Sequence, residues 1–380
     1  MLDVVIVGGG PVGLYLAALL LQEGVNVQVL EQRLRREQHS RAIGIHPPAL
    51  QVLDTVGAAR AMIDAGVPIR TGVALSSGRP VGSMRFASVS DRFPFVLSLP
   101  QFTTEALLER RVLELDGSAL LRGARVKGVT DDGGAVTVAY GPPDDGGAGS
   151  RLTSRLLVAA DGARSRVRSL LNIPVLSRRY PDHYVMGDFA ADGDHHEEAV
   201  LYLAADGIVE SFPLPGGLRR WVVRATRPAD DVDAGGFSGL VHDRTGVRPD
   251  PASSSMLSSF SPRTTMARRL VCGRAVLIGD AAHEISPIGG QGMNLGWLDA
   301  AELAPVIVAA LSGRPVGRDL LGYAAHRSQA ARRARWQAGV NMALGRPLPR
   351  ALLTPRNLAL GTLTGVPGVN RLVARRFTMQ

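Results

Sequence analysis

The chain has 380 residues, of which 45% are hydrophobic and 20% are charged. This composition is typical of a folded globular protein and excludes an intrinsically disordered one, and the length predicts two domains or one large domain with an insertion. No apolar run reaches the roughly 18 residues that a membrane span needs, so we expect no integral membrane association. The single cysteine, Cys272, cannot form an internal disulfide, which favours the cytoplasm.

The net charge of +9 is concentrated at the C-terminus, where ten arginines and no acidic residue follow His326. No nucleic-acid-binding motif accompanies this charge, so we expect no nucleic-acid partner. Prolines divide the segment, which predicts several short helices with a mainly solvated surface. The cluster His195-His196-Glu197-Glu198 lacks metal-ligand spacing on one face, and we expect no metal site.

The first 31 residues predict a complete strand–helix–strand unit. The β-branched run 2–7 leads directly into glycines, as a buried parallel strand does before a tight turn. Residues 13–23 are apolar nearly all round, which is typical of a buried helix, and 25–30 read as a second strand. Glu31 follows at the carboxyl end of that strand.

The turn in this unit has the dinucleotide-binding spacing Gly8-x-Gly10-x-x-Gly13, with Pro11 and Val12 between the last two glycines. The glycines permit a tight turn, close approach of a pyrophosphate and close helix–strand packing, while the helix N-terminus attracts phosphate. Glu31 lies 18 positions after Gly13, near the spacing of an acid that binds ribose hydroxyls. This motif predicts a dinucleotide site without separating FAD from NAD.

The rest of the chain combines segments of mixed helices and strands with one segment of short alternating strands. Helices are predicted over 47–56 and 103–115, a hairpin over 125–140 and a strand over 152–160. Short alternating runs between about 175 and 268 predict an antiparallel sheet, interrupted by a helix near 237–245. A buried strand over 271–278 and helices over 292–311 and 319–338 follow.

Two further motifs each follow a predicted strand. The first motif, Asp161-Gly162-Ala163-Arg164-Ser165, follows the strand predicted over 152–160. The second, Gly279-Asp280-Ala281-Ala282-His283, follows the strand predicted over 271–278. The second leads through Pro287-Ile288-Gly289-Gly290-Gln291-Gly292-Met293-Asn294 into a long helix. Asp280 can accept hydrogen bonds from a ribityl chain, and the positive helix end can stabilise negative charge on a reduced flavin.

These three motifs, in this order, resemble the para-hydroxybenzoate hydroxylase family of single-component (group A) flavoprotein monooxygenases over essentially the whole chain. The resemblance implies FAD as cofactor and NADH or NADPH as co-substrate. It also implies that further positions contact FAD: Gln32, Arg41, Gln101, Val126, Asp161, Gly279, Gly290, Gly292, Met293 and Asn294. Pro287 corresponds to the family's proline beside the flavin ring.

The family's fold would be an α/β structure in which a Rossmann-like, glutathione-reductase-type FAD domain carries an inserted antiparallel-sheet substrate domain and a helical C-terminus. We expect the FAD domain to comprise 1–70, 99–175 and 269–330. The substrate domain would comprise 71–98 and 176–268, and C-terminal helices 331–380.

The family's chemistry would be hydroxylation of a phenolic, quinolone or polyketide-like aromatic compound by O2, through a flavin C4a-hydroperoxide. His46 is a candidate for assisting deprotonation of a phenol, and Arg70, Arg85, Arg219 and Arg224 are candidates for an acidic substrate. A reductase of the geranylgeranyl-reductase type, or a flavin-binding protein without turnover, remains an alternative. The sequence leaves open whether the protein is a monomer or a homodimer.

Overall fold

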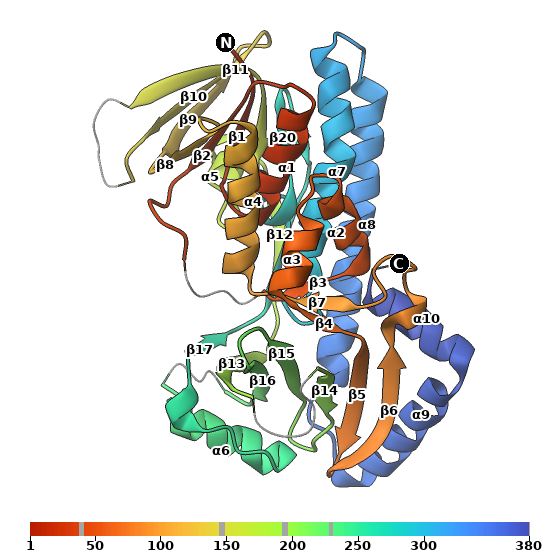
Figure 1. Cartoon of the computed structure of the whole chain (residues 1–380). Helices are drawn as coiled ribbons and strands as arrows, with labels where there is room; N and C mark the ends of the chain where they lie inside the picture. The colour runs from red at the N-terminus through yellow and green to blue at the C-terminus, as the bar shows by residue number, and fades with distance from the viewer. Residues whose placement is uncertain (38–41, 144–148, 192–196, 228–230, 380) are drawn as a thin grey trace.

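The computed structural model describes residues 1–37, 42–143, 149–191, 197–227 and 231–379. Arg41, His195 and His196 lie outside the described residues. Figure 1 shows two sheets, one toward each end of the molecule, with the long helices α7 and α8 along one side. Segments from the whole length of the chain therefore meet where the two sheets adjoin.

The strand–helix–strand unit at the N-terminus is confirmed. β1 (Leu2–Val7) and β2 (Val27–Glu31) pair in parallel, and α1 (Pro11–Gln22) covers them. Leu14 and Leu20 of α1 are fully buried. Burial of one such side chain contributes about 1.5–3 kcal/mol, so the apolar run after the glycines holds α1 on the sheet.

The first sheet has the order β19-β20-β11-β1-β2-β8, in which the strands from β20 to β8 are parallel. The added strands are β8 (Leu120–Arg122), β11 (Ser150–Ala159) and β20 (Ala275–Leu277). Carboxyl ends of parallel strands meet at one edge of a sheet, where open α/β sheets bind their ligands. Glu31 is the last residue of β2, and the glycine loop, Asp161 and Asp280 follow other strands that end at this edge.

The predicted hairpin is present as β9 (Arg125–Asp131) and β10 (Val136–Gly141), which extends the sheet from β11. The continuous strand predicted over 271–278 is wrong. Gly273, with φ +57°, divides it into β19 (Val271–Cys272) and β20, which pair with each other in antiparallel. A β-carbon at this glycine would collide with the carboxylate of Asp131, so the turn is specific to glycine.

The second sheet has seven strands in the order β17-β13-β16-β15-β14-β5-β6. They are β5 (Thr71–Ser76), β6 (Arg79–Arg85), β13 (His183–Ala190), β14 (Ala199–Tyr202), β15 (Val209–Leu214), β16 (Leu218–Ala225) and β17 (Met256–Phe260). All neighbours are antiparallel except β14 and β5, which are parallel. The predicted antiparallel sheet thus has one parallel pair, where strands from distant parts of the chain meet.

The two faces of the second sheet have different neighbours. α6 (Ala234–Thr245) covers one face, where Phe237 stacks on Phe189 with ring centroids 5.5 Å apart and Trp221 joins the same cluster. Side chains alternate between the faces of a strand, so Val222 and its equivalents point to the opposite side. That opposite face is turned toward the first sheet and carries the site described below.

Short elements connect the two sheets. Two three-stranded sheets consist of β3 (Gly44–Ile45), β4 (Val67–Ile69) and β7 (Val96–Ser98), and of β12 (Val175–Arg179), β18 (Arg263–Ala267) and β21 (His283–Glu284). The helices of this region are α2 (Pro47–Asp54), α3 (Ala59–Ala65), α4 (Gln101–Leu115) and α5 (Arg166–Leu170).

α7 (Gln291–Leu311) and α8 (Gly317–Leu344) form the long antiparallel pair. Among the described residues, α7 is the one helix long and apolar enough to cross a membrane, and 56% of its apolar window is buried. It packs against α1, α2 and α8, as a core helix does. α8 runs continuously through residues 330 and 331, where the sequence places a domain boundary; the division into domains stays a prediction.

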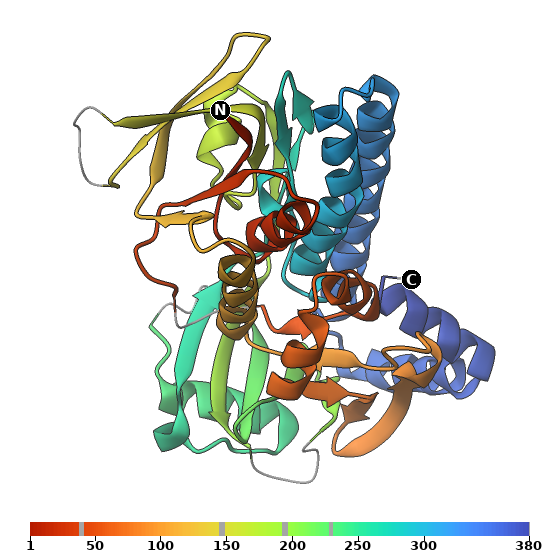
Figure 2. The same ribbon diagram turned by 45° about the horizontal axis from the view of Figure 1, so that its top comes forward.

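The arginine-rich C-terminus is not simply a solvated surface. α9 (Leu353–Gly365) and α10 (Pro367–Phe377) pack against β6, as Figure 2 shows. Ala374 is fully buried, and the ring of Phe377 lies 6.0 Å from that of Phe86. The charge of this segment hides apolar positions at helical spacing, which fix it on the second sheet.

Candidate active site

A cavity of about 1080 Å³ lies between the two sheets. Most of the predicted site residues line it: Gly8, Gly10, Pro11, Val12, Glu31, Gln32, His46, Gln101, Val126, Asp161, Gly279, Asp280, Pro287, Gly290, Gly292 and Met293. Gly13 and Asn294 are not among the lining residues, and Arg41 is outside the described residues. The structure thus brings the predicted residues together, while their individual roles stay predictions.

The three glycines that define the Gly8-x-Gly10-x-x-Gly13 spacing have different surroundings. Gly8 has φ +112°, and a β-carbon there would collide with the carbonyl oxygen of Ala160. A β-carbon at Gly13 would collide with the carbonyl oxygen of Gly8. A β-carbon at Gly10 would meet no atom of the described chain within 4 Å, and its φ of −81° suits any residue. The outer glycines serve the fold, whereas Gly10 leaves room for a ligand.

Glu31 connects the end of β2 to the glycine loop. Its carboxylate accepts a hydrogen bond from the Gly9 N–H at 2.7 Å and from the Arg33 N–H and Nε at 2.8 and 3.0 Å. The side chain lines the cavity although the residue is only 4% exposed. Glu31 therefore fixes the loop and is within reach of a ligand that lies along it.

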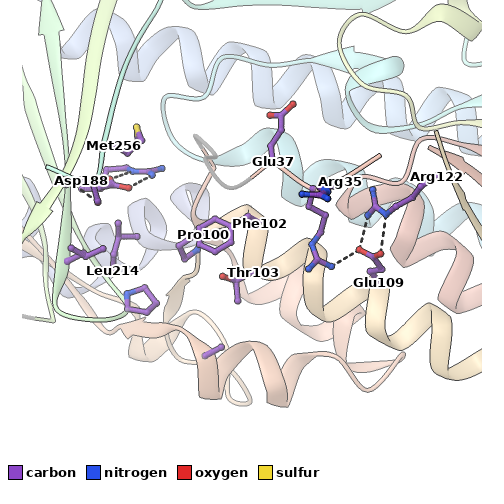
Figure 3. Close-up of a pocket in the computed structure, with 16 residues that line it drawn as sticks. Arg35, Glu37, Pro100, Phe102, Thr103, Glu109, Arg122, Asp188, Leu214 and Met256 are labelled. Atoms are coloured by element: carbon purple, nitrogen blue, oxygen red, sulfur yellow. Dashed lines mark hydrogen bonds and ion pairs between the residues drawn. The ribbon is translucent and has the colours of Figure 1, made fainter. Parts of the chain in front are cut away.

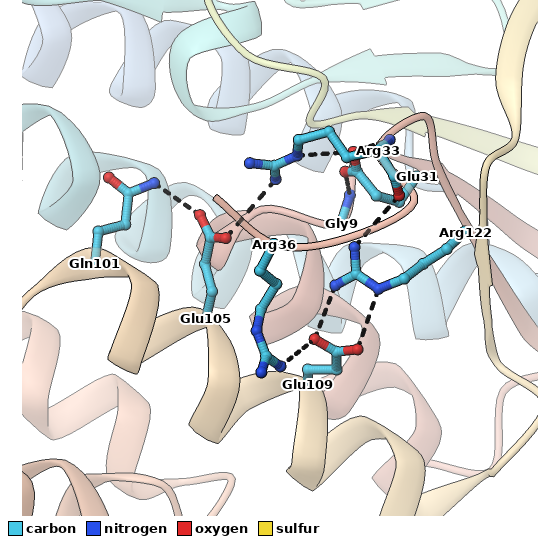
Figure 4. Close-up of polar contacts among 8 residues, drawn as sticks. All are labelled: Gly9, Glu31, Arg33, Arg36, Gln101, Glu105, Glu109 and Arg122. Carbon is cyan, nitrogen blue, oxygen red and sulfur yellow. Dashed lines mark hydrogen bonds and ion pairs between the residues drawn. The ribbon is translucent and has the colours of Figure 1, made fainter. Parts of the chain in front are cut away.

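α4 presents two carboxylates, one turn apart, to the segment that follows β2 (Figure 4). Glu109 pairs with Arg36 at 2.6 Å and with Arg122 at 2.8 Å. Burial would raise the pKa of Glu109, but hydrogen bonds from these two arginines hold it below its ordinary value. Glu105 accepts a hydrogen bond from Gln101 Nε2 at 2.8 Å. The network holds the segment after β2 on α4 and orients Gln101 in the cavity.

The carboxylate of Asp161 organises its own loop. It accepts hydrogen bonds from Ser165 Oγ at 2.5 Å and from the Arg166 N–H at 2.7 Å, at the start of α5. Arg168 Nη1 donates to the carbonyl oxygen of Ala281 at 2.8 Å, so this loop is tied to the Asp280 loop. The side chain of Asp161 acts mainly on loop geometry, and the loop itself faces the cavity.

Asp280 lies in a short 3₁₀ turn, Gly279–Ala281, which is separated from α7 by β21 and a short loop. Its Oδ1 is 3.7 Å from where a β-carbon of Gly292 would lie, so the carboxyl adjoins the first turn of α7. Burial raises the pKa of Asp280 to about 6. Among the described residues, no side chain caps α7, whose N-cap Gly290 has φ +64°. A carboxyl acceptor and helix N–H donors therefore meet at one point in the cavity.

A buried charged cluster lies behind the Asp280 turn. Asp299 on α7 accepts hydrogen bonds from the Gly279 N–H at 2.9 Å, from His283 Nε2 at 2.6 Å and from Arg327 Nε at 2.6 Å. Burial alone would lower the pKa of His283, but Asp299 raises it. Burial would likewise raise the pKa of Asp299, but His283 and Arg327 keep it below its ordinary value. The cluster fixes the turn on α7 and α8.

Asn294 joins three segments beside the cavity. Its Oδ1 accepts a hydrogen bond from the His46 N–H at 2.8 Å, and its Nδ2 donates to the carbonyl oxygens of Gly44 and Gly290 at 2.9 and 2.7 Å. The His46 ring is buried 5.6 Å from that of Phe377, and burial lowers its pKa to about 4. No described residue hydrogen-bonds its Nδ1. His46 is therefore neutral at pH 7, with a free ring nitrogen.

The cavity continues as an apolar chamber against the second sheet. Its walls include Met186, Phe212, Val222, Phe260 and Ile288. The four arginines that the sequence offers for an acidic substrate are not among the lining residues of this cavity: Arg70, Arg85, Arg219 and Arg224. Arg220 does line it, but pairs with Asp188 through two contacts of 2.7 Å.

The C-terminal segment contributes lining residues that the sequence did not reveal. Trp336 and Gln337 of α8, Leu360 of α9, and Arg376 and Phe377 of α10 line the chamber. Arg376 lies over the Trp336 ring at 5.9 Å, and Trp336 remains 59% exposed at the cavity's edge. The only signal in the sequence is the apolar spacing hidden among the arginines.

A second cavity of about 800 Å³ lies beside α4 (Figure 3). Its lining includes Arg35, Glu37, Phe102 and Met256. Arg220 and Glu37 line both cavities, so the two spaces adjoin.

The described residues fit FAD and supply no metal site. Gly10 leaves its backbone open, the starts of α1 and α7 lack side-chain caps among the described residues, and Asp280 faces the cavity between them. Gly10 and the start of α1 suit a pyrophosphate, the start of α7 suits a flavin edge, and Asp280 suits a ribityl chain. Within the described ranges, no group of three His, Cys, Asp or Glu is placed to hold a metal ion.

Comparison with known proteins agrees with this geometry. Residues 1–338 match the family model described as "FAD binding domain", and the chain belongs to this family. The resemblance to para-hydroxybenzoate-hydroxylase-like aromatic monooxygenases is confirmed. The chain is 32% identical over 323 residues to a rifampicin monooxygenase of Streptomyces venezuelae, covering 82% of this chain and 65% of that protein. It spans less than two thirds of the first three curated relatives, at 62–65% of their length.

Solved structures show the same fold. The anhydrotetracycline hydroxylase of Streptomyces rimosus superposes with a TM-score of 0.80 at 30% identity, covering 100% of this chain and 76% of that one. The p-nitrophenol 4-monooxygenase of Pseudomonas putida DLL-E4 has a TM-score of 0.88 at 23% identity, covering 100% and 98%. The latter likeness concerns the fold alone. The predicted Rossmann-like FAD-binding fold with a second sheet is confirmed.

Proposed function

We propose that this chain is an FAD-dependent monooxygenase that hydroxylates an aromatic substrate with NADH or NADPH and O2. One observation carries the proposal: Asp280 and the start of α7, which no described side chain caps, open into the same cavity as the apolar chamber. Cofactor-binding groups and a substrate-sized apolar space therefore adjoin. The names of the relatives support this activity over reduction of a double bond.

The residues divide the cofactor between them. The loop at Gly10 and the start of α1 would hold the pyrophosphate, Glu31 the adenosine ribose, Asp280 the ribityl chain, and the start of α7 the pyrimidine edge of the flavin. FAD bound there would supply the capacity to accept a hydride from NAD(P)H and to activate O2. The protein's task is to hold the cofactor, orient the substrate and keep water away.

His46 acts on the substrate side of this arrangement. With a pKa of about 4, its ring is a weak proton acceptor, so it is better suited to accepting a hydrogen bond from a substrate hydroxyl than to removing the proton. Nε2 would supply that acceptor, because it lies 3.6 Å from where a β-carbon of the cavity-lining Gly290 would be, whereas Nδ1 is itself buried. The carbonyl of Pro287 already accepts the Gly290 N–H at 2.9 Å, so Pro287 shapes the loop next to α7.

The substrate class follows from the chamber. Its walls are aromatic and aliphatic, and the one arginine of the sheet that reaches it is paired with Asp188. This favours a large, weakly charged aromatic compound, such as a polyketide-like ring system, over a small aromatic acid. The names of the rifampicin and anhydrotetracycline enzymes support the same class.

The test is oxidation of NADH and NADPH by FAD-loaded protein with a panel of polycyclic aromatics under ¹⁸O2. We expect substrate-stimulated oxidation and one labelled oxygen atom in the product. Anaerobic turnover to a saturated product would support the reductase alternative instead. Absence of stimulated oxidation despite full FAD content would support a binding protein without turnover.

Two further inferences, about the cellular compartment and the oligomeric state, accompany the proposal. The single cysteine, Cys272, favours a reducing compartment, and we infer the cytoplasm. A monomer or homodimer is the proposed oligomeric state, which size-exclusion chromatography with light scattering would measure.

A further inference from the structure

One acidic side chain projects into the apolar chamber. Glu210 is the second residue of β15, in register with Leu201 of β14 on one side and Val222 of β16 on the other. Its neighbours on this side are Ile208, just before β15, and Phe212, two positions further along the strand, and all of these residues line the cavity. The carboxyl is therefore surrounded by hydrocarbon on the face of the sheet that meets the substrate.

Glu210 has no partner within the part of the chain that the structure describes. No hydrogen bond or ion pair reaches its carboxyl there, and burial raises its pKa to about 7. Two of the arginines that line the cavity are engaged elsewhere. Arg220 pairs with Asp188, and Arg356 Nη2 donates to the carbonyl oxygen of Leu203 at 2.8 Å.

A second polar group close to this wall is also without a partner. The hydroxyl of Tyr184 on β13 is buried, and no described residue hydrogen-bonds it. The negative charge of Glu210 contributes to raising the pKa of Tyr184, after the larger effect of burial, so the two groups are near enough to interact. The ring of Tyr184 stacks on Phe260, 5.4 Å between centroids, which holds it in place. The wall thus combines an apolar surface with fixed, unsatisfied polar groups.

Such a carboxyl discriminates between ligands by their charge. A buried polar group left unpaired loses free energy, which a ligand hydroxyl or carbonyl can restore by hydrogen bonding. As the acid it donates to a carbonyl oxygen, and as the carboxylate it accepts from a hydroxyl. A ligand carboxylate in the same place would bring two negative charges together in a low dielectric.

We propose that Glu210 is a specificity-determining residue that selects uncharged hydroxy- or keto-substituted polycyclic aromatics and excludes aromatic carboxylates. The inference rests on the proposed function, because it takes the chamber as the substrate site. It names the polar edge of the substrate as the part that lies against β15.

The test measures ligand binding to the FAD-loaded full chain. Binding is monitored through the change that it causes in the flavin's visible absorbance. The probes are 1-hydroxyanthraquinone and anthraquinone-2-carboxylate at pH 8, about one unit above the pKa of Glu210, where its charged form prevails. We expect the wild type to bind the hydroxy compound about 10-fold or more tighter than the carboxylate. The affinity of Glu210→Gln for the hydroxy compound should stay within about 3-fold of the wild-type value, because the amide still forms hydrogen bonds. The same variant should bind the carboxylate about 10-fold tighter than the wild type does, because the amide carries no charge.

Glu210→Leu should weaken the hydroxy compound by about 10-fold, and Glu114→Gln, an exposed acid on α4, should leave both affinities unchanged. FAD content and the thermal midpoint check that each variant is folded. If Glu210→Leu fails to fold, the gain of carboxylate binding in Glu210→Gln decides.

Three outcomes would overturn the inference: equal affinities of the two probes in the wild type, no effect of either Glu210 substitution, or no binding of the probes. The binding of the probes needs no turnover. A failure of this inference can therefore be distinguished from a failure of the proposed function. Charge selection that depends on Glu210, found in a protein that forms no oxygenated product, would retain the inference and remove the monooxygenase assignment.

Discussion

Gly10 and Gly13 lie three positions apart in one loop, yet they have different neighbours. A β-carbon at Gly13 meets backbone, and one at Gly10 points into open cavity. A methyl group added at Gly13 therefore tests the packing of the fold, and one added at Gly10 tests the binding of the ligand.

We predict that Gly10→Ala folds with a thermal midpoint within about 2 °C of the wild type, because its backbone angles suit alanine. Its FAD affinity should fall by about 10-fold or more, because the methyl group occupies the path of the pyrophosphate. Gly13→Ala should lose at least about 3 kcal/mol of stability or fail to fold, because the collision is with backbone. Flavin content after dialysis and thermal unfolding measure the two effects; unchanged FAD affinity in Gly10→Ala would refute the assignment.

The arginines of β16 show why single residues of the chamber were hard to predict. Arg219 and Arg220 are adjacent, so strand alternation sends them to opposite faces. Arg219 lies on the α6 side and donates to Ser211 Oγ at 2.5 Å, whereas Arg220 faces the cavity. The run Leu-Arg-Arg-Trp-Val-Val-Arg does not show which of its two alternating sets is inward, since both contain arginine and apolar residues. Glu210 was missed for the same reason.

Among the elements, the start of α7 depends on the cluster of His283, Asp299 and Arg327. Removing the shared carboxylate would leave two buried groups without their partner. We expect Asp299→Asn to lose roughly 3–5 kcal/mol of unfolding free energy. Because the cluster also holds Gly279 N–H, the variant should release FAD more readily even where it is folded.

The same cluster predicts a pH dependence of stability. Asp299 raises the pKa of His283 above 6.5, so this contribution is fully present below pH 6.5 and is lost as the pH rises through the raised value. The lowered pKa of Asp299 adds stability above pH 3.8, which is lost as the pH falls through the lowered value. The cluster therefore contributes most between about pH 4 and 6.5.

Urea unfolding across a pH series measures this dependence. We expect His283→Gln to abolish part of the wild type's decline above pH 6.5. His242→Gln, at a half-exposed position on α6, should leave the decline intact. An identical decline in His283→Gln would show that other groups are responsible.

α10 gives a prediction about the chamber. Phe377 touches both Phe86 and His46, so Phe377→Ala opens the wall beside the His46 ring. We expect about 3- to 10-fold weaker binding of 1-hydroxyanthraquinone with FAD content unchanged, because the contact lies on the substrate side. Leu358→Ala, at a position of α9 that is 69% exposed, is the matched control. Equal affinities in both variants would place α10 outside the substrate site.

At the scale of the whole molecule, sequence patterns predicted the elements whose structure depends on residues close together in the chain. The glycine loop, the hairpin at 131–134 and α7 follow from turn residues and apolar periodicity. The parallel pairing of β14 with β5, and the packing of α9 and α10 on β6, depend on contacts between segments far apart in sequence. Charge dominates the composition of the C-terminus, so its few buried positions left only a weak pattern.

Trp297 Nε1 donates to the carbonyl oxygen of Pro11 at 3.0 Å, across 286 positions of sequence. During synthesis from the N-terminus, the glycine loop therefore emerges long before the helix that completes its site. Contacts of such separation form late, because the loop-closure entropy must be overcome first. Flavin that binds only the completed site would act on the last step of folding. Added FAD should raise the yield of native protein on refolding without hastening the first appearance of helix.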